Sequence, residues 1–242
     1  MKNPTSVFIV IPTYNERGNI PTLIEALFGL GIPDLKLIVV DDASPDGTAE
    51  AVRELAVSYP IHLIERSAKR GLGTAYAEAF QAILAGRVRD WGVPDHVVQM
   101  DADWSHDPAV IPRLLDAARE HDVVIGSRYI AGGGIQNWDR SRRALSFFAN
   151  HYARRVLGVP YRDLTAGFKC YRRTALEALD CGRLSSVGYN FQIETVYRAH
   201  TAGLRIAEIP ITFTERKHGI SKMNLGIMLE SFWKVLLLRL RG

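Results

Sequence analysis

The sequence predicts an α/β fold in which a mostly parallel sheet is flanked by helices, and two observations carry that prediction. Nearly continuous apolar runs of strand length recur at 6–11, 35–40 and 97–100. Such runs are typical of strands that are buried on both faces of a parallel sheet. Longer stretches with helical periodicity separate them, as at 20–28. Strand–helix alternation of this kind predicts right-handed, doubly wound units.

The other expected elements follow from the same two patterns. We expect further strands at 61–64, 122–126 and 205–213 with a short one inside 163–172, and further helices ending at 84 and spanning 111–119, 144–157, 190–202 and 225–240. The glycine- and arginine-bearing stretch 131–143 predicts a mobile loop, because long loops inside compact domains are often functional lids. The economical division is one domain over 1–223 and a C-terminal amphipathic helix over 224–242.

Composition excludes several classes of protein. The 242 residues are 47% apolar, which supports a folded core and argues against disorder. A net charge of +4 without an aromatic and basic RNA motif gives no reason to expect nucleic acid. Cys170 and Cys181 form neither a disulfide framework nor a zinc pattern, so we expect reduced, buried thiols. No secretory signal and no transmembrane span are expected.

Two carboxylates, Asp101 and Asp103, directly follow the apolar run at 97–100. In an extended backbone, side chains two residues apart point the same way, and open α/β sheets bind ligands at this end of their strands. Mg²⁺ takes one or two carboxylates and completes its shell with substrate phosphate oxygens, and Mn²⁺ also favours oxygen ligands. The pair therefore predicts a metal on a nucleoside diphosphate. The alternative is a polar turn in which Ser105 or Asp107 caps a helix.

The glycines and histidines do not complete any familiar motif. The basic loop at 66–75 leads into a helix and could approach phosphate, but it matches neither a P-loop nor a dinucleotide-binding fingerprint. Five of the seven histidines are candidates for metal ligands or bases, and none of these five has ligand spacing with a partner. We therefore expect structural roles for all five, which are His106, His121, His151, His200 and His218.

Several motifs occur together and in order, and together they resemble the GT-A fold of the family 2 inverting glycosyltransferases. They are Ile-Pro-Thr-Tyr-Asn-Glu at 11–16, Val-Asp-Asp-Ala-Ser-Pro-Asp-Gly-Thr at 40–48, Gly-Leu-Gly-Thr-Ala at 71–75, Met-Asp-Ala-Asp at 100–103 and Gly-Ser-Arg-Tyr at 126–129. Later motifs narrow the resemblance to the dolichol- or polyprenol-phosphate mannose synthases. These are 163–168, 188–194 and Glu215-Arg216 with Gly219, Ser221 and Lys222. The resemblance covers about residues 6 to 225.

The resemblance implies an enzyme that moves mannose from GDP-mannose to a polyprenyl (dolichyl-type) monophosphate. Inversion would give a β-linked polyprenyl phosphate mannose and GDP. Two other readings stay open: a transferase that uses UDP-glucose or another UDP-sugar on the same lipid, and an inactive nucleotide-sugar-binding module. Because the acceptor phosphate is already anionic near neutral pH, no dedicated protein base is required, and no activated nucleophile is evident in the sequence.

The resemblance also assigns roles to individual residues. The implied nucleotide-sugar-binding set is Pro12, Tyr14, Glu16, Val40, Asp42, Asp101, Ala102, Asp103, Arg216 and Lys222. The implied metal ligands for Mg²⁺ or Mn²⁺ are Asp103, Asp101 and Ser105, with Ser105 acting directly or through water. Arg216 and Lys222 would lie on a loop that closes over the donor diphosphate. For Asp41 and Asp46, which neighbour this set, capping of the Asp-Gly turn is at least as well supported as contact with the nucleotide.

Arginines are the implied ligands of the acceptor phosphate, because a guanidinium is a planar donor fork that matches phosphate oxygens. Arg128 and Arg142 carry this assignment, although Arg140 and Arg143 are close enough in sequence to compete with Arg142. The implied catalytic set is Asp101, Asp103, Arg128 and Arg216. A solvated basic face is the alternative for each arginine other than Arg128.

A lipid acceptor requires contact with a membrane surface. The helix at 144–157 and the apolar tail at 232–241 are candidates for lying in the interface, on the cytoplasmic side of the membrane. A tail packed on the globular core is the alternative for the second of these. A separate membrane-anchoring partner protein would be another way to reach the lipid.

Overall fold

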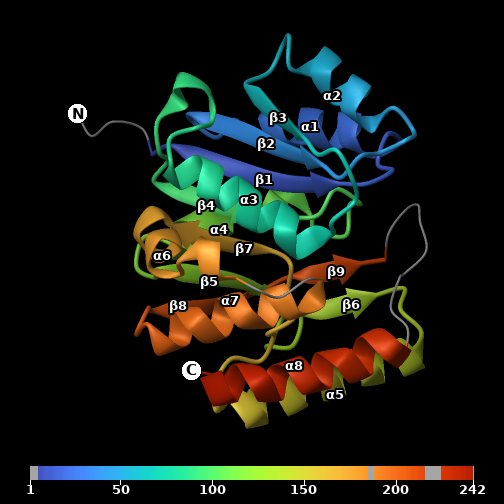
Figure 1. Ribbon diagram of the computed structural model, residues 1–242, viewed down its shortest axis with the longest axis vertical. Coiled ribbons are helices and arrows are strands. Elements are labelled where there is room, and N and C mark those ends of the chain that lie inside the picture. The colour runs from blue at the N-terminus through green and yellow to red at the C-terminus, as the bar shows by residue number, and fades with distance from the viewer. Residues whose placement is uncertain (1–4, 185–187, 216–224, 242) are drawn as a thin grey trace.

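The computed structural model describes residues 5–184, 188–215 and 225–241, and it confirms the α/β fold. The main sheet has the strand order β3-β2-β1-β4-β7-β5-β8, and β6 pairs with β9 in a small second sheet (Figure 1). The strands are β1 (Val7–Thr13), β2 (Leu35–Asp41), β3 (Ile61–Glu65), β4 (His96–Gln99), β5 (Val123–Ser127), β6 (Gly134–Gln136), β7 (Lys169–Arg172), β8 (Ile206–Pro210) and β9 (Thr212–Thr214).

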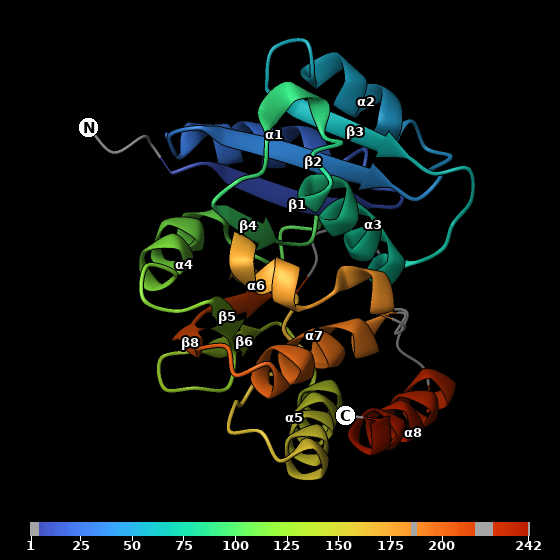
Figure 2. The ribbon, with the colours of Figure 1, turned by 60° about the vertical axis from the view of Figure 1, so that its left-hand side comes forward.

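Helices lie on both faces of this sheet (Figures 1 and 2). The α-helices are α1 (Ile20–Gly29), α2 (Thr48–Leu55), α3 (Leu72–Leu84), α4 (Ile111–Ala117), α5 (Arg140–Leu157), α6 (Arg173–Ala178), α7 (Tyr189–Thr201) and α8 (Leu225–Arg241). Short 3₁₀ turns form at η1 (Arg89–Trp91), η2 (Pro108–Val110) and η3 (Cys181–Arg183).

The interior strand β1 shows why the chain forms two cores. Its side chains alternate between the faces of the sheet. Phe8 and Val10 belong to the core that contains residues of α3 and α7. Ile9 and Ile11 belong to the second core, which contains residues of α1 and α4. A strand buried on both faces needs apolar residues at consecutive positions, which is the pattern seen in the sequence.

The sheet departs from a fully parallel arrangement at one strand. The neighbours β3, β2, β1 and β4 are parallel, and so are β5 and β8. Between β4 and β5 lies β7, which is antiparallel to both, with Cys170 opposite Val98 and Val124. The order of the strands in the sequence therefore does not give their order in the sheet, because a late strand separates two earlier ones.

The expectation of a mobile loop over 131–143 is wrong in two places. Residues 134–136 form β6, which pairs with β9 in parallel. Helix α5 begins at Arg140 rather than at Ala144, and the Asp139 side chain accepts a hydrogen bond from the Arg142 main-chain N–H at 2.8 Å. Because the first turn of α5 is charged, the apolar periodicity of the sequence does not indicate it. The capping carboxylate is the signal that marks the start of the helix.

Helix α8 packs on α5 and α7. Val235 is 3% exposed and belongs to a core cluster, and the Tyr152 hydroxyl donates to the main-chain oxygen of Phe232 at 3.2 Å. The expected domain boundary at residue 223 lies outside the described residues. Among the described helices, none is both long enough and apolar enough to cross a bilayer. Cys170 and Cys181 are buried free thiols, as expected, and burial raises the pKa of each to about 12.

Candidate active site

The turns that follow β1, β2 and β4 have an uncommon backbone conformation. Each contains a non-glycine residue in the left-handed region: Asn15 with φ 62°, Ala43 with φ 59° and Trp104 with φ 63°. This conformation costs free energy for residues with a Cβ and persists where the surrounding structure holds it, often at ligand sites. The three turns lie at the carboxyl end of neighbouring parallel strands, where open α/β sheets bind ligands.

The turn after β1 carries Tyr14 and Glu16, two of the expected nucleotide contacts. Lys69 Nζ lies 3.3 Å from the centroid of the Tyr14 ring, which places the basic loop beside this turn. Glu16 Oε2 accepts from Asn19 Nδ2 at 2.8 Å, and the Glu16 main-chain N–H donates to Thr48 Oγ1 at 3.0 Å. Both expected residues are only half-buried, so this edge is accessible to a ligand.

Two further expected nucleotide contacts lie opposite each other in the sheet. Pro12 on β1 is in register with Val40 on β2. The Val40 side chain is fully buried in the core, so only its main chain can contact a nucleotide. Pro12 is half-buried at the same level.

Asp42 organises the basic loop between β3 and α3. Its carboxylate accepts from the main-chain N–H groups of Arg70 and Gly71 at 2.8 and 2.7 Å. It also accepts from Nη1 of the buried Arg66 at 2.8 Å. Asp42 therefore anchors the loop that places Lys69 over Tyr14. Its neighbour Asp41 holds the turn after β2, where it accepts from Thr13 Oγ1 and from Ser44 N.

The two aspartates expected at a metal lie just after β4. Asp103 is 4% exposed and its Oδ1 accepts from the Ser105 main-chain N–H at 3.1 Å. Asp101 is half-buried and lies 3.3 Å from the Tyr76 hydroxyl, which also contacts the Met100 main-chain oxygen. Burial, helped by the negative charge of Asp101, raises the pKa of Tyr76 well above its usual value, so this hydroxyl remains a donor.

Ser105 and Ala102 complete this turn. Ala102 is 3% exposed and packs in a core cluster, so any ligand contact would use its main chain. The Ser105 side-chain oxygen is buried, and within the described part of the chain it has no hydrogen-bond partner. Burying a hydroxyl without a partner is costly, which indicates that this atom has a partner when the site is loaded.

His106 lies beneath the same turn and is 2% exposed. Its Nδ1 accepts from the main-chain N–H of Asp101 at 3.0 Å. The ring stacks on Phe168 with centroids 4.9 Å apart and meets the edge of Phe213 at 5.7 Å. Burial lowers the pKa of His106, which favours the neutral ring. Sequence spacing could not reveal this placement, because the partner of His106 is a main-chain amide.

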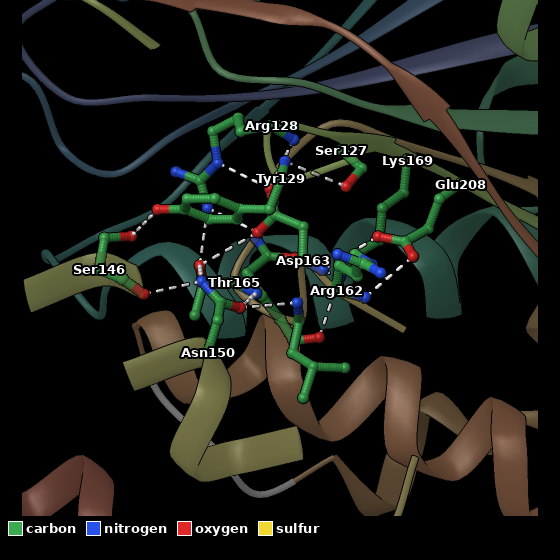
Figure 3. A network of polar contacts seen from close by, with 12 residues as sticks. Ser127, Arg128, Tyr129, Ser146, Asn150, Arg162, Asp163, Thr165, Lys169 and Glu208 are labelled. Atoms are coloured by element: carbon green, nitrogen blue, oxygen red, sulfur yellow. Dashed lines mark hydrogen bonds and ion pairs between the residues drawn. The ribbon is translucent and has the colours of Figure 1, made fainter. Parts of the chain in front are cut away.

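Arg128 follows β5 and is held by a buried carboxylate. Its Nε and Nη2 donate to the two oxygens of Asp163, each at 2.7 Å, and its main-chain N–H donates to Oδ2 at 2.9 Å (Figure 3). Arg128 Nη2 also donates to Thr165 Oγ1 at 2.7 Å. Asp163 is fully buried. This two-point ion pair fixes the guanidinium plane, a role of Asp163 that the sequence alone does not indicate.

Helix α5 holds the segment that contains Asp163. The Asn150 side-chain oxygen accepts from the main-chain N–H groups of Leu164 and Thr165, and its Nδ2 donates to Thr165 Oγ1 at 3.0 Å (Figure 3). On the other side, Glu208 from β8 accepts from the Asp163 main-chain N–H at 3.0 Å. The position of Arg128 thus depends on β5, α5 and β8 together.

Arg142 comes to the same place from the first turn of α5. Its guanidinium lies 4.0 Å from the Trp138 ring centroid, and the Arg128 guanidinium lies 5.8 Å from the same ring. Arg142 also forms an ion pair with Glu215. Arg140 and Arg143 are exposed, whereas Arg142 is not, which favours Arg142 among the three. Two other expected residues, Arg216 and Lys222, lie outside the described residues.

One cavity contains both a residue of the aspartate pair and the two arginines. Its polar part is formed by Asp101, His106, Arg128 and Arg142. Its larger apolar part includes Leu145 and Tyr152 of α5 and Phe232 and Val235 of α8. The cavity is therefore lined by residues of the aspartate turn, by two arginines and by apolar side chains of α5 and α8. Such a cavity suits a ligand with an anionic head and an apolar body.

An α/β sheet with aspartates just after β4, accessible turns after the neighbouring β1 and β2, and a cavity lined by two arginines is the arrangement of a GT-A glycosyltransferase. Comparison with known proteins specifies the family. The chain belongs to glycosyl transferase family 2, whose family model matches residues 8–180.

Two relatives align with almost the whole chain. The polyprenol monophosphomannose synthase of Mycolicibacterium smegmatis is 43% identical over 240 residues, which cover 97% of this chain and 87% of that protein. The undecaprenyl-phosphate mannosyltransferase of Micrococcus luteus is 42% identical over 229 residues, which cover 93% of this chain and 90% of that protein.

Solved structures of low sequence identity share the fold. Glucosyl-3-phosphoglycerate synthase of Mycobacterium tuberculosis, in complex with Mn²⁺, UDP and glucosyl-3-phosphoglycerate, aligns with a TM-score of 0.68 and 20% identity. That alignment covers 99% of this chain and 80% of the other. The same enzyme with phosphoglyceric acid also aligns with a TM-score of 0.68, at 19% identity.

Proposed function

We propose that the protein transfers mannose from GDP-mannose to a polyprenyl (dolichyl-type) monophosphate and releases GDP. The single observation that carries this proposal is the cavity in which Asp101, Arg128 and Arg142 meet the apolar side chains of α5 and α8. Support for mannose and for the lipid acceptor comes from the relatives of 43% and 42% identity, whose names state both.

The acceptor monophosphate would bind beside Arg128 and Arg142, with its isoprenoid chain along the apolar part of the cavity. The ion pair with Asp163 keeps Arg128 oriented before the substrate arrives, which lowers the entropy lost on binding. Arg142 is held by stacking on Trp138. Two positioned guanidinium groups suit a phosphate that must present one oxygen to the sugar.

The donor nucleotide would bind along the turns after β1 and β2. Tyr14 and Glu16 would contact the base, the main chains of Pro12 and Val40 would border it, and Asp42 would act at the ribose side while it holds the basic loop. Arg216 and Lys222 complete the proposed donor site, and they would neutralise charge on the leaving GDP.

The turn after β4 fits a divalent metal. Within the described part of the chain no three His, Cys, Asp or Glu side chains form a metal-binding group, so a metal here would have at most two protein carboxylates. This donor set suits Mg²⁺ or Mn²⁺ held by Asp101 and Asp103 and completed by substrate phosphate oxygens. The buried Ser105 hydroxyl, for which the described residues offer no partner, is available to the same ion or to its water. When bound, such an ion acts as a Lewis acid on the leaving diphosphate.

The proposed reaction is a single in-line displacement that inverts the anomeric carbon. The acceptor phosphate is anionic near neutral pH, so an oxygen can attack mannose C1 without a protein base. The C1–O bond to GDP breaks as the new C1–O bond forms, and the product is a β-linked polyprenyl phosphate mannose. The contribution of Arg128 and Arg142 is orientation, which alone can supply several kcal/mol of the barrier reduction.

The lipid acceptor also places the protein at a membrane, and we propose the cytoplasmic face. The apolar side chains that α5 and α8 leave exposed support a peripheral contact. A separate anchoring protein is the alternative, and nucleic acid is not among the proposed partners.

The test is to incubate the pure protein and Mg²⁺ or Mn²⁺ with farnesyl phosphate and, in separate reactions, with GDP-mannose, GDP-glucose or UDP-glucose. We expect a mannosyl lipid from GDP-mannose alone, detected by mass spectrometry. Replacing Asp103 by Ala should nearly abolish turnover while leaving the fold intact. Product from UDP-glucose alone would move the donor assignment, and GDP binding without product from any donor would favour an inactive binding module.

A further inference from the structure

His106 has a defined proton arrangement. Because Nδ1 accepts the Asp101 main-chain N–H at 3.0 Å, it cannot itself carry a proton, so the ring proton is on Nε2. Within the described part of the chain, no residue accepts a hydrogen bond from that Nε2–H. A ring that is 2% exposed thus presents a donor that no described residue accepts.

The ring is also held in position and faces the cavity. Phe168 stacks on one side at 4.9 Å and Phe213 meets it edge-on at 5.7 Å. Opposite its Nε2 edge lies Gly167: a Cβ added there would be 3.1 Å from His106 Cε1, 3.6 Å from Nε2 and 3.4 Å from Asp101 Oδ2. Because Gly167 has no side chain, there is a space here that both His106 and Asp101 border.

Arg128 faces the same part of the cavity. Its guanidinium lies 5.4 Å from the centroid of the Phe213 ring, the ring that also contacts His106. Asp101, His106 and Arg128 all line the cavity. The Nε2–H of His106, which no described residue accepts, therefore belongs to the same cavity as the aspartate at the proposed metal and the arginine at the proposed acceptor phosphate.

We propose that His106 Nε2–H donates a hydrogen bond to a phosphoryl oxygen of the acceptor monophosphate, which makes His106 a substrate-binding residue. This inference rests on the proposed function. A neutral donor suits that place, because it orients the phosphate without adding a third cation, which would reduce the nucleophilicity of the attacking oxygen. The donor diphosphate is the other source of phosphoryl oxygens, and the experiment distinguishes the two.

Two substitutions separate this role from simple support of the Asp101 turn. In His106→Asn the side-chain oxygen can replace Nδ1 as acceptor for Asp101 N–H, but no donor remains at the Nε2 position. In His106→Gln the amide nitrogen can replace Nε2, but the acceptor for Asp101 is lost. The two variants therefore keep opposite halves of the imidazole.

We expect His106→Asn to raise KM for farnesyl phosphate by roughly 10- to 100-fold, the effect of losing a hydrogen bond to a charged group. KM for GDP-mannose should stay within about threefold of wild type. His106→Gln should retain more of the affinity for the acceptor. The reverse ranking would overturn the proposal, and so would a loss confined to the KM of GDP-mannose, which would assign the donor diphosphate instead. Circular dichroism and the urea midpoint would show whether each variant is folded.

A measurement on the wild-type protein avoids dependence on the variants. In protein labelled with ¹⁵N-histidine, His106 should show a protonated Nε2 and an unprotonated Nδ1, and its Nε2 resonance should shift when farnesyl phosphate is added. The spectrum of His106→Asn, or of His106→Gln, assigns that resonance. A doubly protonated ring, or a resonance unmoved by saturating farnesyl phosphate, would overturn the proposal. If wild type makes no mannosyl lipid, the proposed function fails, whereas this titration still decides whether His106 meets a phosphate.

Discussion

Lys169 on β7 is fully buried, although its side chain is cationic in water. Its Nζ donates to three uncharged oxygens: the main-chain and side-chain oxygens of Gln192, at 2.9 and 2.8 Å, and Thr195 Oγ1 at 3.1 Å. Burial lowers the pKa of Lys169 from 10.5 to about 7, and the nearby Asp163 charge only partly opposes this. The lysine is therefore near its midpoint of titration at neutral pH.

This lowered pKa predicts how stability depends on pH. Between about pH 7 and 10.5 the unfolded chain binds more protons at Lys169 than the folded chain does, so the free energy of unfolding should rise with pH. Lys169→Met should remove that rise. The measurement is the urea midpoint of both proteins between about pH 7 and about pH 8.5.

The upper limit of that range avoids an opposite effect. The raised pKa values of Cys170 and Cys181 mean that the folded chain holds more protons than the unfolded chain above about pH 9, which lowers stability there. Both proteins share these thiols, so the difference between them reports Lys169. Equal pH slopes for the wild type and Lys169→Met would show that the buried amine does not titrate in this range.

Contacts between a buried polar side chain and residues that are distant in sequence, such as those of Lys169, cannot be predicted from the sequence alone. Asp101 and Asp103 stand out in the sequence because they directly follow an apolar run, although the structure places them in the turn after β4 and not in an extended strand. His106 and Lys169 do not stand out, because their partners are a main-chain amide and a side chain on α7, which no spacing reveals. Asp163 belonged to a recognised motif, yet only the fold shows that it holds Arg128.

Between elements, the Arg128–Asp163 pair joins the end of β5 to the segment between α5 and β7. Both partners are buried, with 7% and 0% of their side chains exposed. Removing one partner of a buried pair leaves an uncompensated charge, whereas removing both does not. The pair should therefore show strong thermodynamic coupling between its two sides.

We predict that Asp163→Leu alone destabilises the protein by about 3–5 kcal/mol, and that the double variant Arg128→Met/Asp163→Leu is more stable than the two separate losses imply. Urea unfolding of the wild type, both single variants and the double variant measures the coupling. Additive losses would mean that the pair contributes only independent contacts.

The chain supplies a matched control for this cycle. Arg205 contacts Asp122 through the same three groups, its main-chain N–H, Nε and Nη2, at 2.9, 3.1 and 3.0 Å. Here the arginine side chain is 60% exposed. Because water screens an exposed pair, the same cycle on Arg205 and Asp122 should give a much smaller coupling. Similar coupling in both cycles would contradict burial as the cause.

Predictions for whole elements succeeded where an apolar pattern defines the element. β1, β2 and β4 are buried on both faces, and their apolar runs predicted them to within a few residues. β7 was expected only as a short strand, and its place between β4 and β5 was not foreseen, because that place depends on contacts between distant segments. The expected strand at 205–213 divides at Pro210, which cannot donate to a ladder, into β8 and β9 of different sheets.

At the scale of the whole molecule, exposed apolar side chains gather on two helices. Phe147 and Phe148 of α5 are 54% and 64% exposed, and Trp233 and Leu240 of α8 are 64% and 82% exposed. The two helices pack together at the end of the molecule far from α2 (Figures 1 and 2). They also supply the apolar part of the cavity, so a membrane contact here would bring the lipid acceptor to Arg128 and Arg142.

We predict that Phe147→Ser/Phe148→Ser weakens binding to vesicles that contain anionic lipid by roughly tenfold or more, since burying one aromatic side chain in an apolar phase contributes about 1.5–3 kcal/mol. Flotation of the full chain with vesicles measures this. Val57→Ser is the matched control, because Val57 follows closely after α2 in the chain and is 88% exposed, and α2 lies at the opposite end of the molecule (Figure 1). Turnover of farnesyl phosphate in detergent should change little, because that assay needs no bilayer contact.

Equal flotation of the wild type and the double variant would place the membrane contact elsewhere. A separate anchoring protein would then be the leading explanation for access to the lipid.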